Sequence, residues 1–401
     1  MKKPVLIAGL IALAAFAMFR FYDPAPDVPA SAQVSGGSSR LSELLSGDTA
    51  EGYPMAIAAR TFQFPEDHGP HPDFRNEWWY LTGNLEDRRG RRFGFELTFF
   101  RFALSPGLQT APRRSSDSKW QTRQVYIAHF AVTDEKSEQF HVAQRASRGA
   151  LGLAGAQTRP FRVWLEDWSI MERQEDGAAV TAGEHWQLNA PGEQVSLHLE
   201  LTADKPPVLN GINGLSQKSA ERGNASYYYS ISRLHSDGRL RIADENFEVS
   251  GLSWLDREWS SSALSADQRG WDWFALQLSD DSDLMFYNIR SNDGSRDEHS
   301  AGTWISANGD VRHLSRDDVA IVVTDEWASP EGGIYPAGWD IGIAQLDLQL
   351  SVAPIIANQE LFTTVRYWEG AVEVSGRHGG IPVKGRGYVE LTGYGRIAES
   401  E

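Results

Sequence analysis

The chain has 401 residues, 41% of them hydrophobic and 23% charged, a composition typical of a globular protein long enough for two domains. Its net charge of −16 argues against nucleic acid as a partner, because the phosphates would be repelled. The sequence has no cysteine, which excludes disulfides, thiolate chemistry and cysteine-based metal sites.

The first 22 residues predict an export signal or a membrane anchor. Lys2 and Lys3 precede an uncharged apolar run over residues 5–19. This run is shorter than the ~20 residues that span a membrane, so we expect either a cleaved signal or a retained anchor. In both cases the protein is exported, and we place it in the periplasm or at the inner membrane. Residues 23–58 are rich in Pro, Ala, Ser and Gly and predict a flexible tether.

From Thr61 onward the sequence is dominated by strand patterns. Its 14 Trp and 37 Gly favour β-structure with many turns over helix bundles. Many short strands with regular turns predict sandwiches or barrels. We expect strands at residues 77–85, 92–102, 124–133, 162–172, 196–202, 239–249, 271–278, 284–290, 319–324, 340–350, 363–375 and 385–391.

Three large aromatic residues follow one another in Glu77-Trp78-Trp79-Tyr80. In a strand, Trp78 and Tyr80 would lie on one face and Trp79 on the other. Indole N–H and phenol O–H groups each need a hydrogen-bond partner once they are buried. The segment therefore predicts an early strand whose aromatic side chains line two different compartments.

Several of these motifs occur twice in the same order. Trp78-Trp79-Tyr80, a charged turn and residues 95–101 are echoed by Trp271-Asp272-Trp273-Phe274, an Asp-rich turn and residues 284–290. Each half later carries a Trp-rich strand and ends near Glu-Leu-Thr. This repetition predicts two related domains, at residues 59–222 and 223–401, with the junction in the polar stretch 211–225.

The best chemical candidate is the segment from Gly251 to Trp259, which contains Trp254, Asp256 and Glu258. A carboxyl group desolvated by tryptophan has a raised pKa and can serve as a general acid near neutral pH. Tryptophan faces can also stabilise a developing positive charge. The alternative is structural: Asp256 and Glu258 would pair with Arg257 or other bases at a barrel rim.

Other chemistries find less support in the sequence. His68 and His71 lie among carboxylates, but the surrounding prolines exclude a helix and the spacing is not that of a zinc peptidase. We expect a rigid loop there and no metal. No Gly-x-Ser-x-Gly motif and no phosphate-cradling glycine loop occurs, so nothing indicates serine hydrolysis or nucleotide binding.

Two further groups lie on expected strands. Tyr227, Tyr228 and Tyr229 could supply hydroxyl groups to a pocket, and His129 could face a barrel interior. A core strand and a satisfied core histidine are the alternatives.

Taken together, the motifs resemble those of the AttH and carotenoid 1,2-hydratase (hydroxyneurosporene synthase) family. The resemblance covers residues 62–396 and implies a tandem of lipocalin-like antiparallel β-barrels, an all-β fold that agrees with the internal repeat. It is carried by seven segments, at residues 64–72, 76–84, 126–134, 227–230, 251–259, 367–372 and 387–394.

The resemblance implies a function as well as a fold. The carotenoid branch of the family adds water to an isoprenoid double bond without a cofactor, which here would use Asp256 as the acid, beside Trp254 and Tyr228. We therefore expect an exported protein that binds a long hydrophobic ligand, a lipid or an isoprenoid. The export signal departs from the carotenoid branch, so the substrate and the reaction itself stay open. The expected ligand-binding residues are Trp78, Trp79, Tyr80, His129, Tyr227, Tyr229, Trp259, Trp271, Trp273 and Trp368.

A third hypothesis comes from another class of function. Relatives of this kind are often encoded beside components of ABC transporters. The chain could therefore be a non-catalytic periplasmic partner of an ABC-type exporter, at the membrane surface.

Overall fold

The computed structural model describes residues 51–107, 118, 122–173, 184–262, 264–363 and 366–395. The expected export segment and most of the expected tether lie outside these residues. The described residues all belong to one compact unit, residues 38–396. Among them, no helix has the length and apolar character that a membrane crossing requires.

The first of two antiparallel sheets holds strands β1 to β13 in the order β4-β3-β2-β1-β13-β12-β9-β8-β7-β6-β5, with β10 and β11 paired to β12. Strands β3 and β4 at one end of this order contact β5 and β6 at the other. The strands are β1 (Asn76–Asp87), β2 (Arg92–Ala103), β3 (Gln124–Asp134), β4 (Gln139–Arg148), β5 (Ala154–Gln157), β6 (Arg162–Leu165), β7 (Trp168–Glu172), β8 (His185–Ala190), β9 (Val195–Ala203), β10 (Val208–Leu209), β11 (Leu215–Gln217), β12 (Ala225–Ile242) and β13 (Glu245–Ser260).

The second sheet has the order β17-β16-β15-β14-β23-β22-β20-β19-β18, with β21 paired to β22. Its strands are β14 (Gln268–Leu278), β15 (Asp283–Ser291), β16 (Ala301–Ile305), β17 (Val311–Ser315), β18 (Ala320–Ala328), β19 (Ile334–Ile343), β20 (Leu348–Pro354), β21 (Glu360–Phe362), β22 (Arg366–His378) and β23 (Ile381–Leu391). The described helices are single 3-10 turns, at η1 (Glu66–His68), η2 (Arg316–Asp318) and η3 (Ala344–Leu346).

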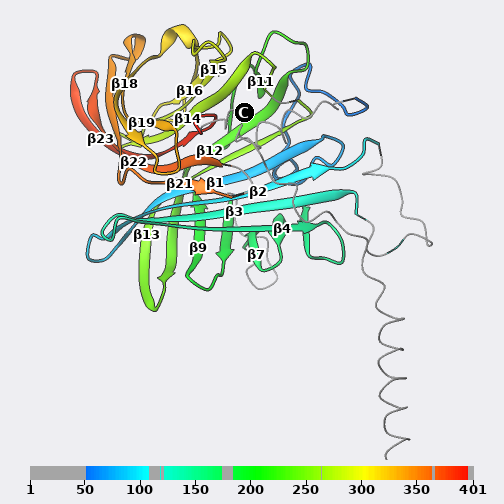
Figure 1. The fold of residues 1–401 in the computed structure, drawn as a ribbon. Coiled ribbons are helices and arrows are strands. Elements are labelled where there is room, and N and C mark those ends of the chain that lie inside the picture. Colours follow the sequence, from blue (N-terminus) through cyan, green and yellow to red (C-terminus); the bar gives the residue numbers. More distant parts are fainter. Residues whose placement is uncertain are drawn as a thin grey trace, which may run out of the picture. The chain divides into compact units, whose positions relative to one another are not determined.

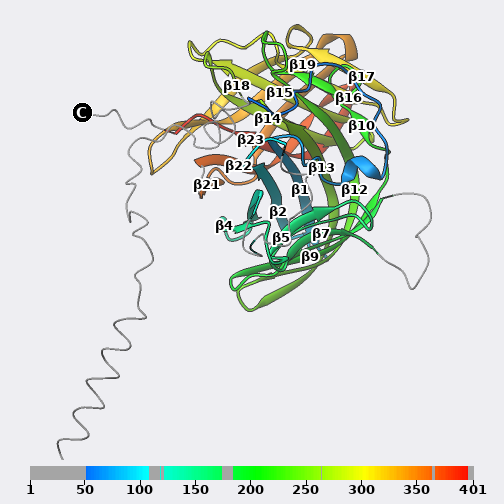
Figure 2. The same cartoon turned by 90° about the vertical axis from the view of Figure 1, so that its right-hand side faces the viewer.

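The expected all-β fold of two antiparallel barrels is confirmed. The two sheets lie against each other and curl, one into a nearly closed barrel and the other into a half-barrel (Figures 1 and 2). Their strand orders correspond: β1 pairs with β2 and with the last strand of its sheet, β13, and β14 pairs in the same way with β15 and β23. The repeated motifs found in the sequence therefore start both sheets.

The change from one sheet to the other does not fall at residues 211–225, where the sequence placed it. Strands β12 and β13 belong to the first sheet, because β13 pairs with β1 over its whole second half. The chain enters the second sheet only between Ser260 and Gln268. A boundary at residues 222/223 would separate β13 from its partner β1.

Each sheet surrounds its own packed hydrophobic core. Trp79, Trp168 and Trp259 are buried in the core of the first sheet, and Trp339 and Trp368 in that of the second. A third cluster of buried side chains lies between the sheets and includes residues of β1, β12, β13 and β14. Packed side chains fill the inside of each curled sheet. The space for a ligand lies between the two sheets.

Strand β1 contributes to two of these clusters through its alternation. Trp79 and Leu81 point into the first core, whereas Tyr80 packs in the cluster between the sheets and Trp78 contacts that cluster. The predicted placement of Trp78 and Tyr80 on one face and Trp79 on the other is what the strand shows.

The two sheets come into close contact where β2 meets β22. A Cβ atom at Gly94 would overlap the Cβ of Ala371. Changing Gly94 to Ala is expected to lower the free energy of unfolding by about 1–3 kcal/mol, as overpacking does elsewhere. Urea unfolding of the variant measures this loss.

Two variants control that measurement. Adding Ala371→Gly to Gly94→Ala should restore most of the stability, because it empties the overlapped position. Gly342→Ala is the matched strand control, since the nearest atom to its new Cβ lies at 4.0 Å. Equal losses for Gly94→Ala and Gly342→Ala would contradict the close contact.

Candidate functional site

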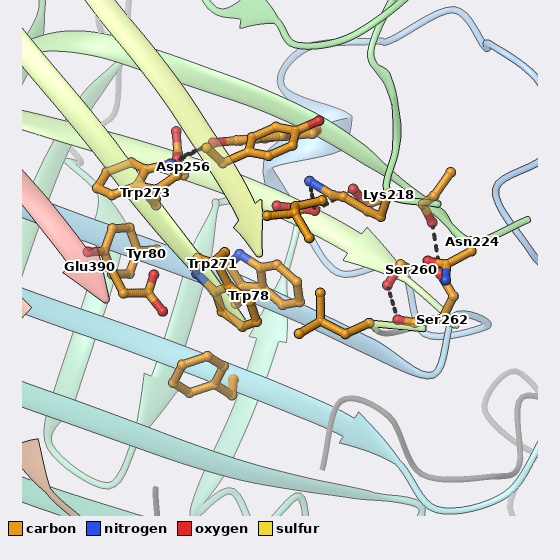
Figure 3. Close-up of a pocket in the computed structure, with 18 of the residues that line it drawn as sticks. Trp78, Tyr80, Lys218, Asn224, Asp256, Ser260, Ser262, Trp271, Trp273 and Glu390 are labelled. Carbon is orange, nitrogen blue, oxygen red and sulfur yellow. Dashed lines mark hydrogen bonds and ion pairs between the residues drawn. The ribbon is translucent and has the colours of Figure 1, made fainter. Parts of the chain in front are cut away.

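A cavity lined by aromatic and polar side chains lies between the two sheets and has about 950 Å³ of empty space, its open part included. Figure 3 shows its arrangement: Trp78 and Trp271 lie in the middle, between two ends that carry polar groups. Asp256, Trp273, Tyr80 and Glu390 gather at one end. The other end is formed by Lys218, Asn224, Ser260 and Ser262.

Aromatic side chains from both sheets form most of the cavity wall. Trp78 and Tyr80 come from β1, and Trp271 and Trp273 from β14, the equivalent first strand of the second sheet. The rings of Tyr80 and Trp273 meet edge to face with centroids 5.0 Å apart. Residues of the two repeated motifs thus face each other across the cavity.

Asp256 is buried and accepts hydrogen bonds from three side chains. Ser230 Oγ lies 2.5 Å and Trp254 Nε1 2.7 Å from its Oδ1, and the Tyr228 hydroxyl donates to Oδ2. Strand alternation puts Trp254 beside it on the same face of β13, and Ser230 lies directly opposite on β12. Tyr228 also accepts a hydrogen bond of 3.1 Å from Trp273 Nε1.

The protonation of Asp256 is set by a balance of two effects. Burial raises its pKa to about 7, against the lowering effect of the hydrogen bonds from Ser230, Tyr228 and Trp254. The carboxyl group therefore gains and loses its proton near neutral pH, the range in which a general acid or base is most effective.

The ion pairs that the sequence offered as an alternative are arranged differently. Arg257 points to the opposite face of β13, where it pairs with Glu77 at 2.5 Å and stacks on Trp79. Glu258 pairs with Lys218 at 3.2 Å. Asp256 forms no ion pair with any described residue, so it is the carboxyl group of this segment that is not neutralised by a base.

Lys218 was not singled out in the sequence. It precedes β12, and its Nζ lies 4.0 Å from the ring centroid of Tyr287 on β15. Burial works against its charge, but the neighbouring Glu258 raises its pKa, so it stays protonated.

Two more carboxyl groups of the cavity were missed, Glu369 on β22 and Glu390 on β23. They lie directly opposite each other in the register of the two strands. Tyr80 donates a hydrogen bond of 2.7 Å to Glu369 Oε2 across the two sheets. The sequence contained a signal for Glu369, because this residue interrupts the apolar run 367–372. Its neighbour Glu390 could be identified only from the pairing of β22 with β23.

Not all the expected ligand-binding residues reach the cavity. Trp78, Tyr80, Trp271 and Trp273 line it, as do the expected catalytic residues Asp256 and Tyr228. Trp254 contacts it through Asp256. The remaining expected residues pack elsewhere: Trp79, Tyr227, Tyr229 and Trp259 lie in the first core, Trp368 in the second, and His129 behind the cavity wall.

His129 is a satisfied buried histidine. Its Nδ1 lies 2.5 Å from the hydroxyl of Tyr367, which itself lines the cavity. Burial lowers the pKa of His129 to about 4, so it is neutral at physiological pH.

The histidines of residues 64–72 take part in hydrogen bonds. His71 stacks on Trp259 with ring centroids 3.7 Å apart, and its Nε2 lies 3.0 Å from Asp67. His68 contacts the Tyr229 hydroxyl at 2.6 Å. No group of three or more His, Asp or Glu suited to a metal occurs in the described part of the chain.

Comparison with known proteins places the chain in a family. The sequence profile described as AttH-like matches residues 55–394, which is most of the chain. The chain belongs to the AttH-like family. Solved structures that share the fold of this AttH-like protein include one from Nitrosomonas europaea and one from Nectria haematococca. No curated protein matches its sequence.

The two structures differ in how close they are. A candidate AttH from Nitrosomonas europaea is 32% identical, with a TM-score of 0.74 over 85% of this chain and 99% of that one. Kievitone hydratase from Nectria haematococca has a TM-score of 0.61 over 86% of this chain and 97% of its own. At 15% identity, the second likeness establishes the fold alone.

Proposed function

We propose that this AttH-like protein binds an apolar ligand, a lipid or an isoprenoid, in the cavity between its sheets and adds water to a carbon–carbon double bond of that ligand. The observation that carries the proposal is Asp256: a buried carboxyl group without a basic partner among the described residues, with a pKa of about 7, at the end of an aromatic cavity. The fold shared with kievitone hydratase supports it.

The proposed reaction follows from the position of this acid. Asp256 donates its proton to one carbon of the double bond, and the π electrons form the new C–H bond. The positive charge left on the other carbon is stabilised by the surrounding faces of Trp78, Trp271 and Trp273. Water attacks this carbon, a C–O bond forms, and the proton lost by the water returns to the Asp256 carboxylate.

The hydrogen-bond partners of Asp256 keep it in place during this cycle. Tyr228, Ser230 and Trp254 hold both carboxylate oxygens after the proton has left. Addition of water changes no oxidation state overall, so the reaction itself calls for no redox cofactor.

Two measurements test the proposal. Protein purified from the cell envelope is extracted with organic solvent, and we expect mass spectrometry to find a bound lipid or isoprenoid. The protein is then incubated with kievitone or with an acyclic carotenoid in ¹⁸O-labelled water, and we expect a product that has gained one labelled water.

Absence of both a bound ligand and a labelled product would overturn the proposal. Co-purification with a membrane permease, without a bound ligand, would favour the alternative role as a partner of an ABC-type exporter. We also propose that the protein works outside the cytoplasm, on the basis of its N-terminal pattern; fractionation of cells that express the full chain tests this localisation.

A further inference from the structure

The cavity is lined by more acidic side chains than basic ones. Its walls hold four carboxyl groups, those of Asp256, Glu258, Glu369 and Glu390, and Lys218 is the one cation among the described lining residues. Lys218 is already paired with Glu258. Three carboxyl groups therefore face the cavity without a basic partner among the described residues.

Glu369 and Glu390 are the unusual members of this set. They are cross-strand neighbours on one face of the second sheet, where two like charges destabilise each other. Glu369 is one of the residues that line the cavity and is fully buried. Its Oε1 has no hydrogen-bond partner among the described residues. Glu96 of β2 is buried on the facing sheet and adds a third carboxyl group to their surroundings.

We propose that this end of the cavity binds an organic cation, an ammonium group carried on an apolar chain. The unpartnered oxygen of Glu369 and the adjacent Glu390 would receive the charge, and Trp273, Trp271 and Tyr80 would offer their ring faces and edges around it. The described residues provide no group suited to a metal ion, and an aromatic wall suits an alkylammonium. Binding of a cation forms and breaks no covalent bond, so this proposal does not depend on the proposed hydration reaction.

Charge compensation links this binding to proton release. Burial raises the pKa of Glu390 to about 8, and burial with Glu390 and Glu96 as neighbours raises that of Glu369 well above its usual range. Both shifts favour the protonated form of the carboxyl group in the empty cavity. A cation beside them lowers their pKa, so we expect its binding to displace a proton.

Other ionisable groups lie around Glu369 and Glu390, and their protonation between pH 6 and 8 matters for the test. Tyr80, Tyr367 and Tyr388 have pKa values raised above their usual range and stay neutral, whereas Lys218 stays charged. Glu96 has a pKa well above its usual range, and Glu258 is paired with Lys218. Asp256, with a pKa of about 7, also titrates in this interval, so variants are needed to assign the proton.

The test compares two ligands that share a geranyl chain and differ in the charge of the head group, geranyltrimethylammonium and geranyl methyl ether. Isothermal titration calorimetry in two buffers of different ionisation enthalpy gives both affinity and proton release. We expect the ammonium to bind about tenfold more tightly than the ether at pH 7.5, with release of about one proton. Its affinity should rise by up to about tenfold per pH unit between pH 6 and 8.

Glu369→Gln and Glu390→Gln keep the side-chain shape and remove the charge, so each should lose most of the preference and the proton release. Glu326→Gln on the exposed face of β18 is the matched control and should change neither. If circular dichroism shows that Glu369→Gln does not fold, the variant Glu390→Gln is used alone, because Glu390 is partly exposed. Equal affinity of the two ligands for the unmodified protein, or unaltered proton release in the Glu390 variant, would overturn the inference.

The two proposals can fail separately. Hydration without a preference for the ammonium would leave only the hydratase proposal standing. Ammonium binding without hydration would leave only the cation site.

Discussion

Replacing Glu77 with alanine is expected to lower the free energy of unfolding by ~3–5 kcal/mol, the cost of leaving buried charges without their partner. Glu77 is fully buried between Arg101 and Arg257, which are buried as well. Its Oε1 accepts from Arg101, and its Oε2 lies 2.5 Å from Arg257. Without the carboxylate, two guanidinium groups would face each other in the core of the first sheet.

Urea unfolding measures this loss, and exposed Glu326→Ala is the control, which should change stability by about 0.5 kcal/mol or less. Glu77→Gln separates charge from packing, because the amide keeps the volume of the side chain. A loss below about 1 kcal/mol for Glu77→Ala would contradict the buried network and resemble an exposed ion pair instead.

The same network predicts a dependence of stability on pH. Burial opposes the charge of Glu77, but Arg101 and Arg257 outweigh it and hold the pKa of Glu77 well below its usual range. The folded state therefore binds fewer protons here than the unfolded state. The contribution is complete above the unfolded pKa of ~4.3 and is lost as the pH falls further. We expect the unfolding free energy of Glu77→Ala, measured between pH 6 and 3, to fall less steeply than that of the unmodified protein.

Local patterns in the sequence predicted many of the strands and the direction of several side chains. The expected strands at residues 162–172, 239–249 and 340–350, however, each run across a turn that joins two strands. Alternation alone gives the two faces of Trp78 and Trp79, and it places Trp254 on the same face as Asp256. The role of Arg257 could not be found in this way. Its partner Glu77 is far away in the sequence, and the pair exists only because β1 and β13 are neighbours.

The same limit explains why some expected residues lie away from the cavity and why the sheets change at another point of the chain. Trp259 and Trp368 are aromatic residues on strands, like Trp78, and nothing local distinguishes a side chain that fills a core from one that lines a cavity. The sequence placed the domain junction in a polar stretch, yet β12 and β13 pair with the first sheet. Glu369 and Glu390 become neighbours only through the register of β22 and β23.

Asp256→Asn is expected to reduce hydration of a double bond by about 10²–10⁴-fold, the usual contribution of a general acid. The amide occupies the same volume and can still accept hydrogen bonds from Ser230 and Trp254, but it cannot donate the proton that starts the reaction. Initial rates of labelled-water incorporation, with kievitone or the carotenoid that proves to be a substrate, measure this loss. Thermal unfolding of the variant shows whether the fold is intact.

The pH profile provides a sharper test of the same assignment. With a pKa raised to about 7, Asp256 is protonated below that pH and ionised above it. An enzyme that needs the protonated form should lose activity as the pH rises above about 7, by up to about tenfold per unit. Any activity left in Asp256→Asn should lack this decline, and a decline that persists in the variant would assign the proton to another group.

The variant Ser230→Ala should shift the loss of activity with rising pH to higher pH, a shift that we expect only if Asp256 is the acid. Ser230 donates to the carboxylate and lowers the pKa of Asp256, so its removal should raise that pKa and shift the loss of activity to higher pH. Ser236→Ala, on the same strand and bonded to Ser253 at 2.6 Å, is the matched control and should leave the profile in place. If both variants leave the profile unchanged, the group that titrates is not the carboxyl group held by Ser230, Tyr228 and Trp254.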